Sequence, residues 1–177
     1  WIELFTNGRG RKMVTALPTG ILDRPKNAAL KYDHNLERAK DLLKRAGFPG
    51  GKGVPNLKFD MRSADSASRQ IGEFLQEQFA QIGLKLEIIY NTFPAFLEKL
   101  KNGDLQISYG GWQMDYPDAE NVYQLLYGPN QAPGPNESNF NHPEMNKLYQ
   151  KMASERSGPG RAATVKRMDD ILQEEVP

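Results

Sequence analysis

The sequence contains no cysteine, and this absence removes several kinds of chemistry at once. Disulfide bonds, thiolate metal sites and cysteine nucleophiles all need the thiol group, so none of them can operate in this chain. No apolar run approaches the roughly 20 residues that a membrane-crossing helix requires. The formal net charge is only +1, with no run of lysine and arginine, and we therefore expect no nucleic-acid partner.

Motifs for the common cofactors and catalytic sites are also missing. The chain has no Gly-x-Gly-x-x-Gly, no Gly-x-x-x-x-Gly-Lys-Ser/Thr, no Gly-x-Ser-x-Gly and no His-Glu-x-x-His. Its two histidines, His34 and His142, lie in separate loop or cap contexts, whereas zinc needs clustered ligands. We expect neither a cofactor nor a metal. One catalytic option stays open, because a pair of carboxylates for acid–base chemistry is available among Asp104, Asp115, Asp118 and Glu120.

What the chain does contain is a regular alternation of strand and helix patterns. Apolar residues in alternation or in a short run predict strands at 57–61, 84–90 and 105–109. Apolar residues at helical spacing predict helices at 36–46, 71–82 and 93–100. Strand, helix, strand with short links is a βαβ unit, whose strands are parallel. The predicted fold is therefore α/β, a small and mostly parallel sheet flanked by helices.

Polar residues and glycines mark the ends of these elements. Candidate helix caps are Asp33 or Asn35, then Asp65, Ser66 or Ser68, then Thr92, and the predicted stops are Gly47, Gly83 and Gly103. Residues 1–30 show no sustained period and predict an irregular entry with one or two short strands. Residues 31–127 form the predicted α/β core. The remainder, 128–177, predicts a loop and two helices, at 143–155 and 161–175.

The stretch from Gly110 to Asn121, Gly-Gly-Trp-Gln-Met-Asp-Tyr-Pro-Asp-Ala-Glu-Asn, is the candidate binding site. Two glycines follow the predicted strand and leave its end without side chains, which permits another molecule to approach the backbone. Trp112, Met114 and Tyr116 offer apolar faces, and Asp115 and Asp118 offer negative charge. Such a combination suits a ligand that carries a positive group. A tight turn beside a buried tryptophan would produce the same pattern, so both interpretations stand.

Five segments in the same order resemble the C-terminal lobe of the family 5 extracellular solute-binding proteins, the oligopeptide- and dipeptide-binding receptors of ABC importers. They are 32–49, with Glu-Arg-Ala-Lys-Asp-Leu-Leu-Lys-Arg-Ala-Gly-Phe-Pro at its end, 71–87, 96–105, the signature Gly-Trp-Gln-Met-Asp-Tyr-Pro-Asp at 111–118, and Asn-Phe-Asn-His-Pro-Glu at 139–144. The resemblance covers most of the chain, and the signature is its most specific part.

The resemblance implies a periplasmic-binding-protein-like (type II) fold, with residues 1–177 forming a single lobe of a larger two-lobe receptor. It implies an extracytoplasmic, non-catalytic protein that hands its solute to ABC permease subunits in the membrane, and we expect a monomer. Because the chain begins at Trp1 and ends at Pro177 directly after a helix pattern, we also expect it to be a piece of a longer protein. Besides peptides, members of the family carry nickel chelates, haem and sugars, so these solutes stay open.

The resemblance also implies roles for individual residues. The signature aspartate of peptide receptors pairs with the ammonium group of the peptide, and here it is Asp115. The backbone at Gly111 and Gln113 corresponds to main chain that pairs with an extended peptide, and Trp112 matches a residue lining the cleft. Tyr116 and Tyr109 complete the expected ligand-binding set. Tyr109 departs from the arginine that some peptide receptors carry two residues before the glycine, which leaves any carboxylate contact open.

Overall fold

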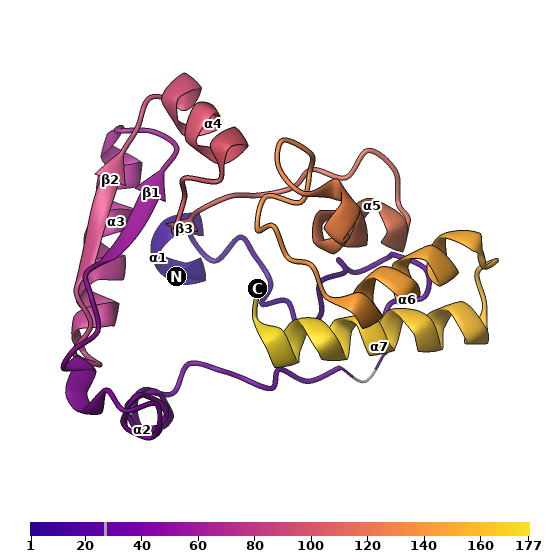
Figure 1. Cartoon of the computed structure of the whole chain (residues 1–177), viewed down its shortest axis with the longest axis horizontal. Coiled ribbons are helices and arrows are strands. Elements are labelled where there is room, and N and C mark those ends of the chain that lie inside the picture. Colours follow the sequence, from indigo (N-terminus) through magenta and orange to yellow (C-terminus); the bar gives the residue numbers. More distant parts are fainter. Residues whose placement is uncertain (27) are drawn as a thin grey trace. The chain divides into compact units, whose positions relative to one another are not determined.

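The computed structural model describes residues 1–26 and 28–177, and the chain divides into two compact units (Figure 1). We call Asp33–Gly111 the sheet unit. The helical unit combines Trp1–Tyr32 with Trp112–Pro177. The sequence patterns did not predict this division. The single-lobe assignment of residues 1–177 remains a prediction.

The sheet unit contains three parallel strands, as predicted. They are β1 (Leu57–Met61), β2 (Leu86–Tyr90) and β3 (Ile107–Ser108), in the order β2-β1-β3. The register pairs Leu57 with Leu86 and Phe59 with Ile107, and all pairings are parallel. Parallel neighbours in one sheet require crossover connections, and helices α3 (Ser66–Ala80) and α4 (Phe93–Asn102) provide them.

The core of the sheet unit lies between the sheet and α3, which runs along it in Figure 1. Its buried members, Phe59, Met61 and Leu86, come from the strands, and the predicted apolar stripe of α3 packs against them. Helix α2 (Leu36–Arg45) behaves differently, because it has no buried residue and Leu42 is 41% exposed. The apolar spacing therefore predicted the helix correctly, but that face is only partly buried in this structure.

Side-chain caps fix the helix starts in the sheet unit at the predicted residues. Asn35, rather than Asp33, caps α2 by accepting the Arg38 backbone N–H at 2.8 Å. Asp65 and Thr92 accept backbone N–H groups in the same way at the starts of α3 and α4. The predicted stops also hold, since Gly47, Gly83 and Gly103 all have positive φ.

Strand β3 is shorter than the predicted 105–109, with only Ile107 and Ser108 in the ladder. The side chain of Gln106 lies at this late start. Its Oε1 accepts the backbone N–H of Lys58 at 2.7 Å. A side-chain oxygen thus takes the hydrogen bond from β1 at the residue just before the ladder with β3 begins. The sequence pattern predicted the strand but could not predict this side-chain hydrogen bond.

The helical unit is built on a separate core. Its helices are α1 (Ile2–Thr6), α5 (Ala119–Tyr123), α6 (Pro143–Ser154) and α7 (Pro159–Glu175), with 3-10 turns at Gln124–Leu126 and Gly128–Asn130. Helices α6 and α7 lie side by side (Figure 1). Buried residues of α5, α6 and α7 form the core together with Leu17 from the N-terminal segment. Segments far apart in sequence therefore make one unit.

The prediction of one or two short strands within residues 1–30 was wrong. Helix α1 occupies Ile2–Thr6, and the described part of this segment contains no strand. Trp1 and Phe5, four residues apart, bring their ring centroids to 4.7 Å, as the helical spacing allows. Across the described residues, no helix is both long enough and apolar enough to cross a membrane.

Candidate functional site

The signature stretch lies where the chain passes from one unit to the other, between Gly111 and Trp112. On the sheet-unit side, Tyr109 follows β3 directly and is 46% exposed. Gly111 is also exposed, and a Cβ added there would meet no atom within 4 Å. The backbone that follows β3 is therefore open to an approaching molecule, as the two glycines predicted.

On the helical-unit side, Trp112 and Asp115 are brought together by one buried side chain, that of Asn121. The Trp112 indole Nε1–H donates to Asn121 Oδ1 at 2.9 Å, and the Asp115 backbone N–H donates to the same oxygen at 3.3 Å. Asn121 Nδ2 donates to Asp115 Oδ2 at 3.3 Å. The indole of Trp112 nevertheless stays 44% exposed, so the tryptophan is not the core residue of the alternative interpretation.

Helix α5 fixes the position of Asn121. Asp118 caps this helix by accepting the Glu120 backbone N–H at 2.8 Å, and the Asn121 backbone N–H donates to the Asp118 carbonyl. The side chain of Gln124 donates to the Asn121 carbonyl at 3.1 Å. Asn121 is only 1% exposed, so its amide can serve only the protein groups around it.

A second hydrogen-bonded group holds Tyr116. Its hydroxyl donates to one carboxylate oxygen of Glu120, and the Tyr149 hydroxyl donates to the other at 2.5 Å. The hydrogen bond to Glu120 raises the pKa of Tyr116, because ionising the phenol would destroy it. Tyr149 in turn stacks on Tyr127 with ring centroids 4.3 Å apart. Tyr116 is thereby tied to α6, while its ring remains exposed.

A third group neutralises Asp118. The guanidinium of Arg161, on α7, contacts Asp118 Oδ1 at 2.5 Å and Asp23 Oδ2 at 2.7 Å, and its Nε–H donates to the Met152 carbonyl. Burial acts to raise the pKa of Asp118, but the hydrogen bonds from Arg161 and from the Glu120 backbone outweigh burial and hold this pKa below the ordinary value. Asp118 is thus an ionised structural carboxylate.

The three acidic residues of the stretch Gly110–Asn121, namely Asp115, Asp118 and Glu120, consequently have different surroundings. Asp118 is paired with Arg161, and Glu120 accepts two tyrosine hydroxyls. Asp115 is exposed, and no described residue gives its carboxylate a cation or a hydroxyl donor. Its Oδ2 accepts only the Asn121 amide, and its Oδ1 accepts no hydrogen bond from a described residue. Of the three, Asp115 alone has an exposed carboxylate without a cation or hydroxyl partner among the described residues.

The remaining predicted residue, Gln113, is exposed and lies between the two anchored positions Trp112 and Asp115. The assignment of these residues to a ligand-binding site remains a prediction. Sequence reasoning missed Asn121 and Arg161. Asn121 had one usable signal, since it lies three residues after the cap Asp118, a position from which a side chain reaches back past the helix start. Arg161 had none, because its partners are 43 and 138 residues away.

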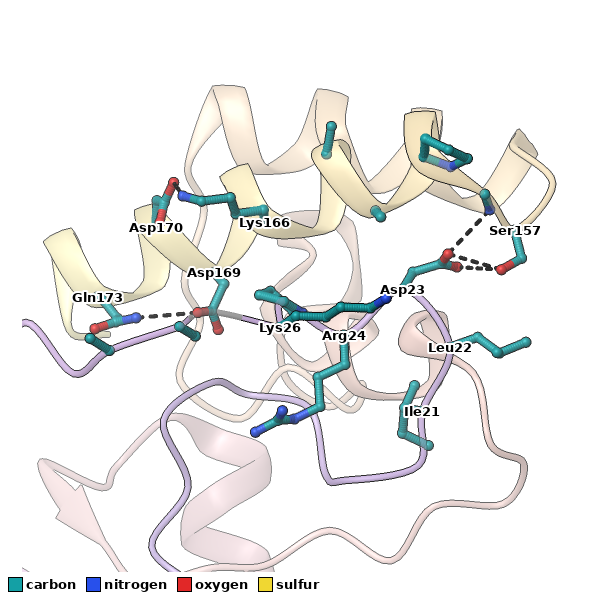
Figure 2. Close-up of a pocket in the computed structure, with 17 residues that line it drawn as sticks. Ile21, Leu22, Asp23, Arg24, Lys26, Ser157, Lys166, Asp169, Asp170 and Gln173 are labelled. Carbon is teal, nitrogen blue, oxygen red and sulfur yellow. Dashed lines mark hydrogen bonds and ion pairs between the residues drawn. The ribbon is translucent and has the colours of Figure 1, made fainter.

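The helical unit also contains a cavity of about 920 Å³ beside α7 (Figure 2). Its walls come from residues 21–29, apart from the undescribed position 27, and from residues 157–173. Each of its carboxylates already has a partner in the protein. Asp23 contacts Arg161, Asp169 accepts the Ala16 backbone N–H, and Asp170 pairs with Lys166. We therefore do not place a ligand ammonium group in this cavity.

Comparison with known proteins identifies the family to which this chain belongs. The profile of the family described as "Bacterial extracellular solute-binding proteins, family 5 Middle" matches residues 1–134. Among curated proteins, the oligopeptide-binding protein OppA of Bacillus subtilis is 27% identical over 99% of this chain, and haem-binding protein A of Haemophilus influenzae is 24% identical over 99%. The chain spans about a third of the length of these relatives, 33% and 32% respectively.

Solved structures agree on the fold. The periplasmic binding protein DppA of Helicobacter pylori, determined with the peptide STSA, superposes with a TM-score of 0.84 at 24% identity, over 99% of this chain and 34% of that one. The unliganded murein tripeptide-binding protein MppA gives a TM-score of 0.85 at 18% identity, over 99% of this chain and 34% of its own. The type II periplasmic-binding-protein fold predicted from the sequence is therefore confirmed. The chain belongs to the family 5 bacterial extracellular solute-binding proteins.

Proposed function

We propose that residues 1–177 form the C-terminal lobe of a non-catalytic receptor that binds peptides outside the cytoplasm, with the Asp115 carboxylate pairing with the ammonium group of the ligand. One observation carries the proposal. Among the three acidic residues of the stretch Gly110–Asn121, only Asp115 combines exposure with a carboxylate that no described cation or hydroxyl contacts. A charge-assisted hydrogen bond between such a carboxylate and an ammonium group contributes roughly 1.5–3 kcal/mol.

Aromatic side chains and open backbone supply the rest of the proposed contacts. Trp112 and Tyr116, 44% and 45% exposed, offer apolar surface on either side of Asp115 in the chain. Both rings are held in place through hydrogen bonds at their polar atoms, so a ligand would meet ordered surfaces. The exposed residues Gly111 and Gln113 suit main-chain pairing with an extended peptide, and the exposed Tyr109 precedes them in the chain.

The names of the relatives support the class of ligand. OppA of Bacillus subtilis is named an oligopeptide-binding protein, and DppA of Helicobacter pylori was determined with a bound peptide. By the same reasoning we propose ABC permease subunits as partners, an extracytoplasmic location and a monomeric state. A non-peptide solute is the second candidate, favoured by the similarity to a haem-binding protein.

A carboxylate-using hydrolase is the enzymatic alternative, and the surroundings of the acidic residues argue against it. A general acid needs a carboxyl group whose pKa is raised toward the working pH. The pKa of Asp118 is instead lowered, with Arg161 as a direct partner, and Glu120 is occupied by Tyr116 and Tyr149. Between Gly110 and Asn121 this leaves Asp115 without a second free carboxylate, and Asp104, the remaining member of the candidate set, lies outside that stretch.

Replacement of Asp115 by asparagine in the intact receptor tests the proposal. The peptide to use is the one that the receptor enriches from a random tri- to pentapeptide library, prepared with a free and with an N-acetylated amino end. We expect Asp115→Asn to weaken binding of the free-amine peptide by about tenfold or more, as measured by calorimetry, and to leave the acetylated peptide nearly unaffected. Asp104→Asn, at another exposed acid, is the control and should change neither affinity.

Two outcomes would overturn this assignment. Equal losses for the free-amine and acetylated peptides would mean that Asp115 does not receive the ammonium group. Enrichment of no peptide, together with saturable binding of haem, would favour the non-peptide candidate.

A further inference from the structure

The amide of Asn121 lies behind the proposed ammonium site and contacts two of its residues, Trp112 and Asp115. We infer that Asn121 is the positioning residue of the site, an inference that rests on the proposed function. Asn121 holds the Asp115 carboxylate in the orientation that receives the ligand, and it fixes the Trp112 ring beside this carboxylate. Nothing in the sequence motif by itself assigns this role.

The two carboxylate oxygens of Asp115 differ in their hydrogen-bond partners. Asn121 Nδ2 donates to Oδ2 at 3.3 Å, on the protein side, and no described donor contacts Oδ1. A carboxylate held through one oxygen cannot rotate freely, so the other oxygen keeps one direction. The ligand ammonium then meets a fixed acceptor and does not have to order a mobile side chain, which would lower the affinity.

The chemistry at position 121 requires an amide. Its Oδ1 accepts from the Trp112 indole at 2.9 Å and from the Asp115 backbone at 3.3 Å, while its Nδ2 supplies the donor to the carboxylate. A hydrocarbon of similar size offers neither function. An aspartate at this position would keep the acceptor but place a second negative charge against Asp115. Asparagine provides both functions without adding a charge.

Burial separates this role from direct ligand binding. Asn121 is 1% exposed, so its amide does not face the solvent from which a ligand would arrive. Any effect of Asn121 on affinity must therefore pass through the groups it contacts, Asp115 and Trp112. This predicts a dependence on the charge of the ligand that a purely structural residue would not show.

The test compares Asn121→Leu with Asn136→Leu in the intact receptor. Asn136 is the matched control, because it is 0% exposed in the same unit and its amide donates to the backbone carbonyls of Tyr127 and Phe140, away from Asp115. We expect Asn121→Leu to weaken the free-amine peptide by about fivefold more than its acetylated counterpart. The control should leave the ratio of the two affinities unchanged. Asn121→Ala, which leaves room for water, provides a second variant should the leucine variant fail to fold.

A double variant isolates the coupling. In an Asp115→Asn background, Asn121→Leu should leave the free-amine to acetylated ratio unchanged, since the carboxylate it orients is gone. If Asp115→Asn is selective but both Asn121 variants weaken the two peptides equally, the positioning role is refuted while the proposed function stands. If Asp115→Asn itself is unselective, the proposed function fails, and the positioning role fails with it.

Discussion

The buried guanidinium of Arg161 permits the sharpest prediction about stability in the helical unit. Its side chain is 5% exposed and joins three segments, through Asp23 near the N-terminus, Asp118 at the start of α5 and the Met152 carbonyl near the end of α6. We consider the replacement Arg161→Leu, which keeps the hydrocarbon volume and removes the charge. Removing this charge leaves the carboxylates of Asp23 and Asp118 without their cation.

The structure indicates that Asp23 is the more sensitive partner. Its side chain is 4% exposed, so without Arg161 it would be a buried carboxylate with no cation. The Asp118 side chain is 39% exposed and water can solvate it. Breaking a buried pair by removing one partner costs about 3–5 kcal/mol. Because the Ser157 hydroxyl and the Gly158 N–H still donate to Asp23, we expect the lower end, a loss of about 3 kcal/mol in the free energy of unfolding.

Urea unfolding of the intact protein, followed by circular dichroism, measures the loss. The decisive variant is the double replacement Asp23→Asn with Arg161→Leu. If the damage comes from an unpaired buried charge, neutralising Asp23 should restore about half of the lost stability, so the second mutation is stabilising. Further destabilisation by Asp23→Asn would refute the reasoning, because it would show that Asp23 is stabilised without Arg161.

Arg167 supplies a matched control on the same helix. It forms two hydrogen bonds to Glu144 at 2.8 Å, but both side chains are largely solvated, 41% and 45% exposed. Solvent screens such a pair, and water replaces it readily when one partner is removed. Arg167→Leu should therefore change stability far less than Arg161→Leu, even though the distances in the two pairs are similar.

Two further predictions concern acid stability and backbone geometry. Because the folded-state pKa of Asp118 is lowered, its stabilising contribution is present above the pKa of an unfolded aspartate and is lost as the pH falls through the folded-state value. Asp118→Asn should thus flatten the decline of stability below about pH 4, and an unchanged acid limb in pH-dependent urea melts would contradict this. Gly83→Ala would place Cβ 2.2 Å from the Gly50 carbonyl oxygen at φ +83°, a loss of about 3 kcal/mol. Gly47→Ala, at φ +91° in open space, should cost only about 1 kcal/mol, and equal shifts in urea midpoint would refute the close-approach argument.

The sheet unit was largely predictable from sequence because its determinants are local. Alternating residues at 57–61 and helical spacing at 71–82 report burial on one face, and capping by Asn35, Asp65 and Thr92 uses a donor only three residues away. Where the prediction failed in detail, a distant group intervened. Just before β3, Gln106 Oε1 accepts the backbone N–H of Lys58, 48 residues away.

The helical unit was less predictable, because its contacts join the two ends of the chain. The N-terminal segment has no periodic pattern, yet Leu17 lies in the core and the Ala16 N–H donates to Asp169, 153 residues later. Nothing local in residues 1–30 indicates these partners. The division of the chain between Gly111 and Trp112 was likewise not readable from composition, since no linker-like stretch marks it.

The sequence alone determined the α/β class, the order and type of the main elements and the family, because periodicity, caps and a short motif are written in neighbouring positions. Only the tertiary structure decided which of Asp115, Asp118 and Glu120 has a carboxylate without a cation or hydroxyl partner among the described residues. Three carboxylates within six residues look alike in sequence, but Arg161 neutralises one, two tyrosines donate to another, and the third accepts only the buried Asn121 amide among the described residues. The ionic and hydrogen-bonding state of a side chain depends on groups that folding brings near it, and these lie up to 43 residues away along the chain.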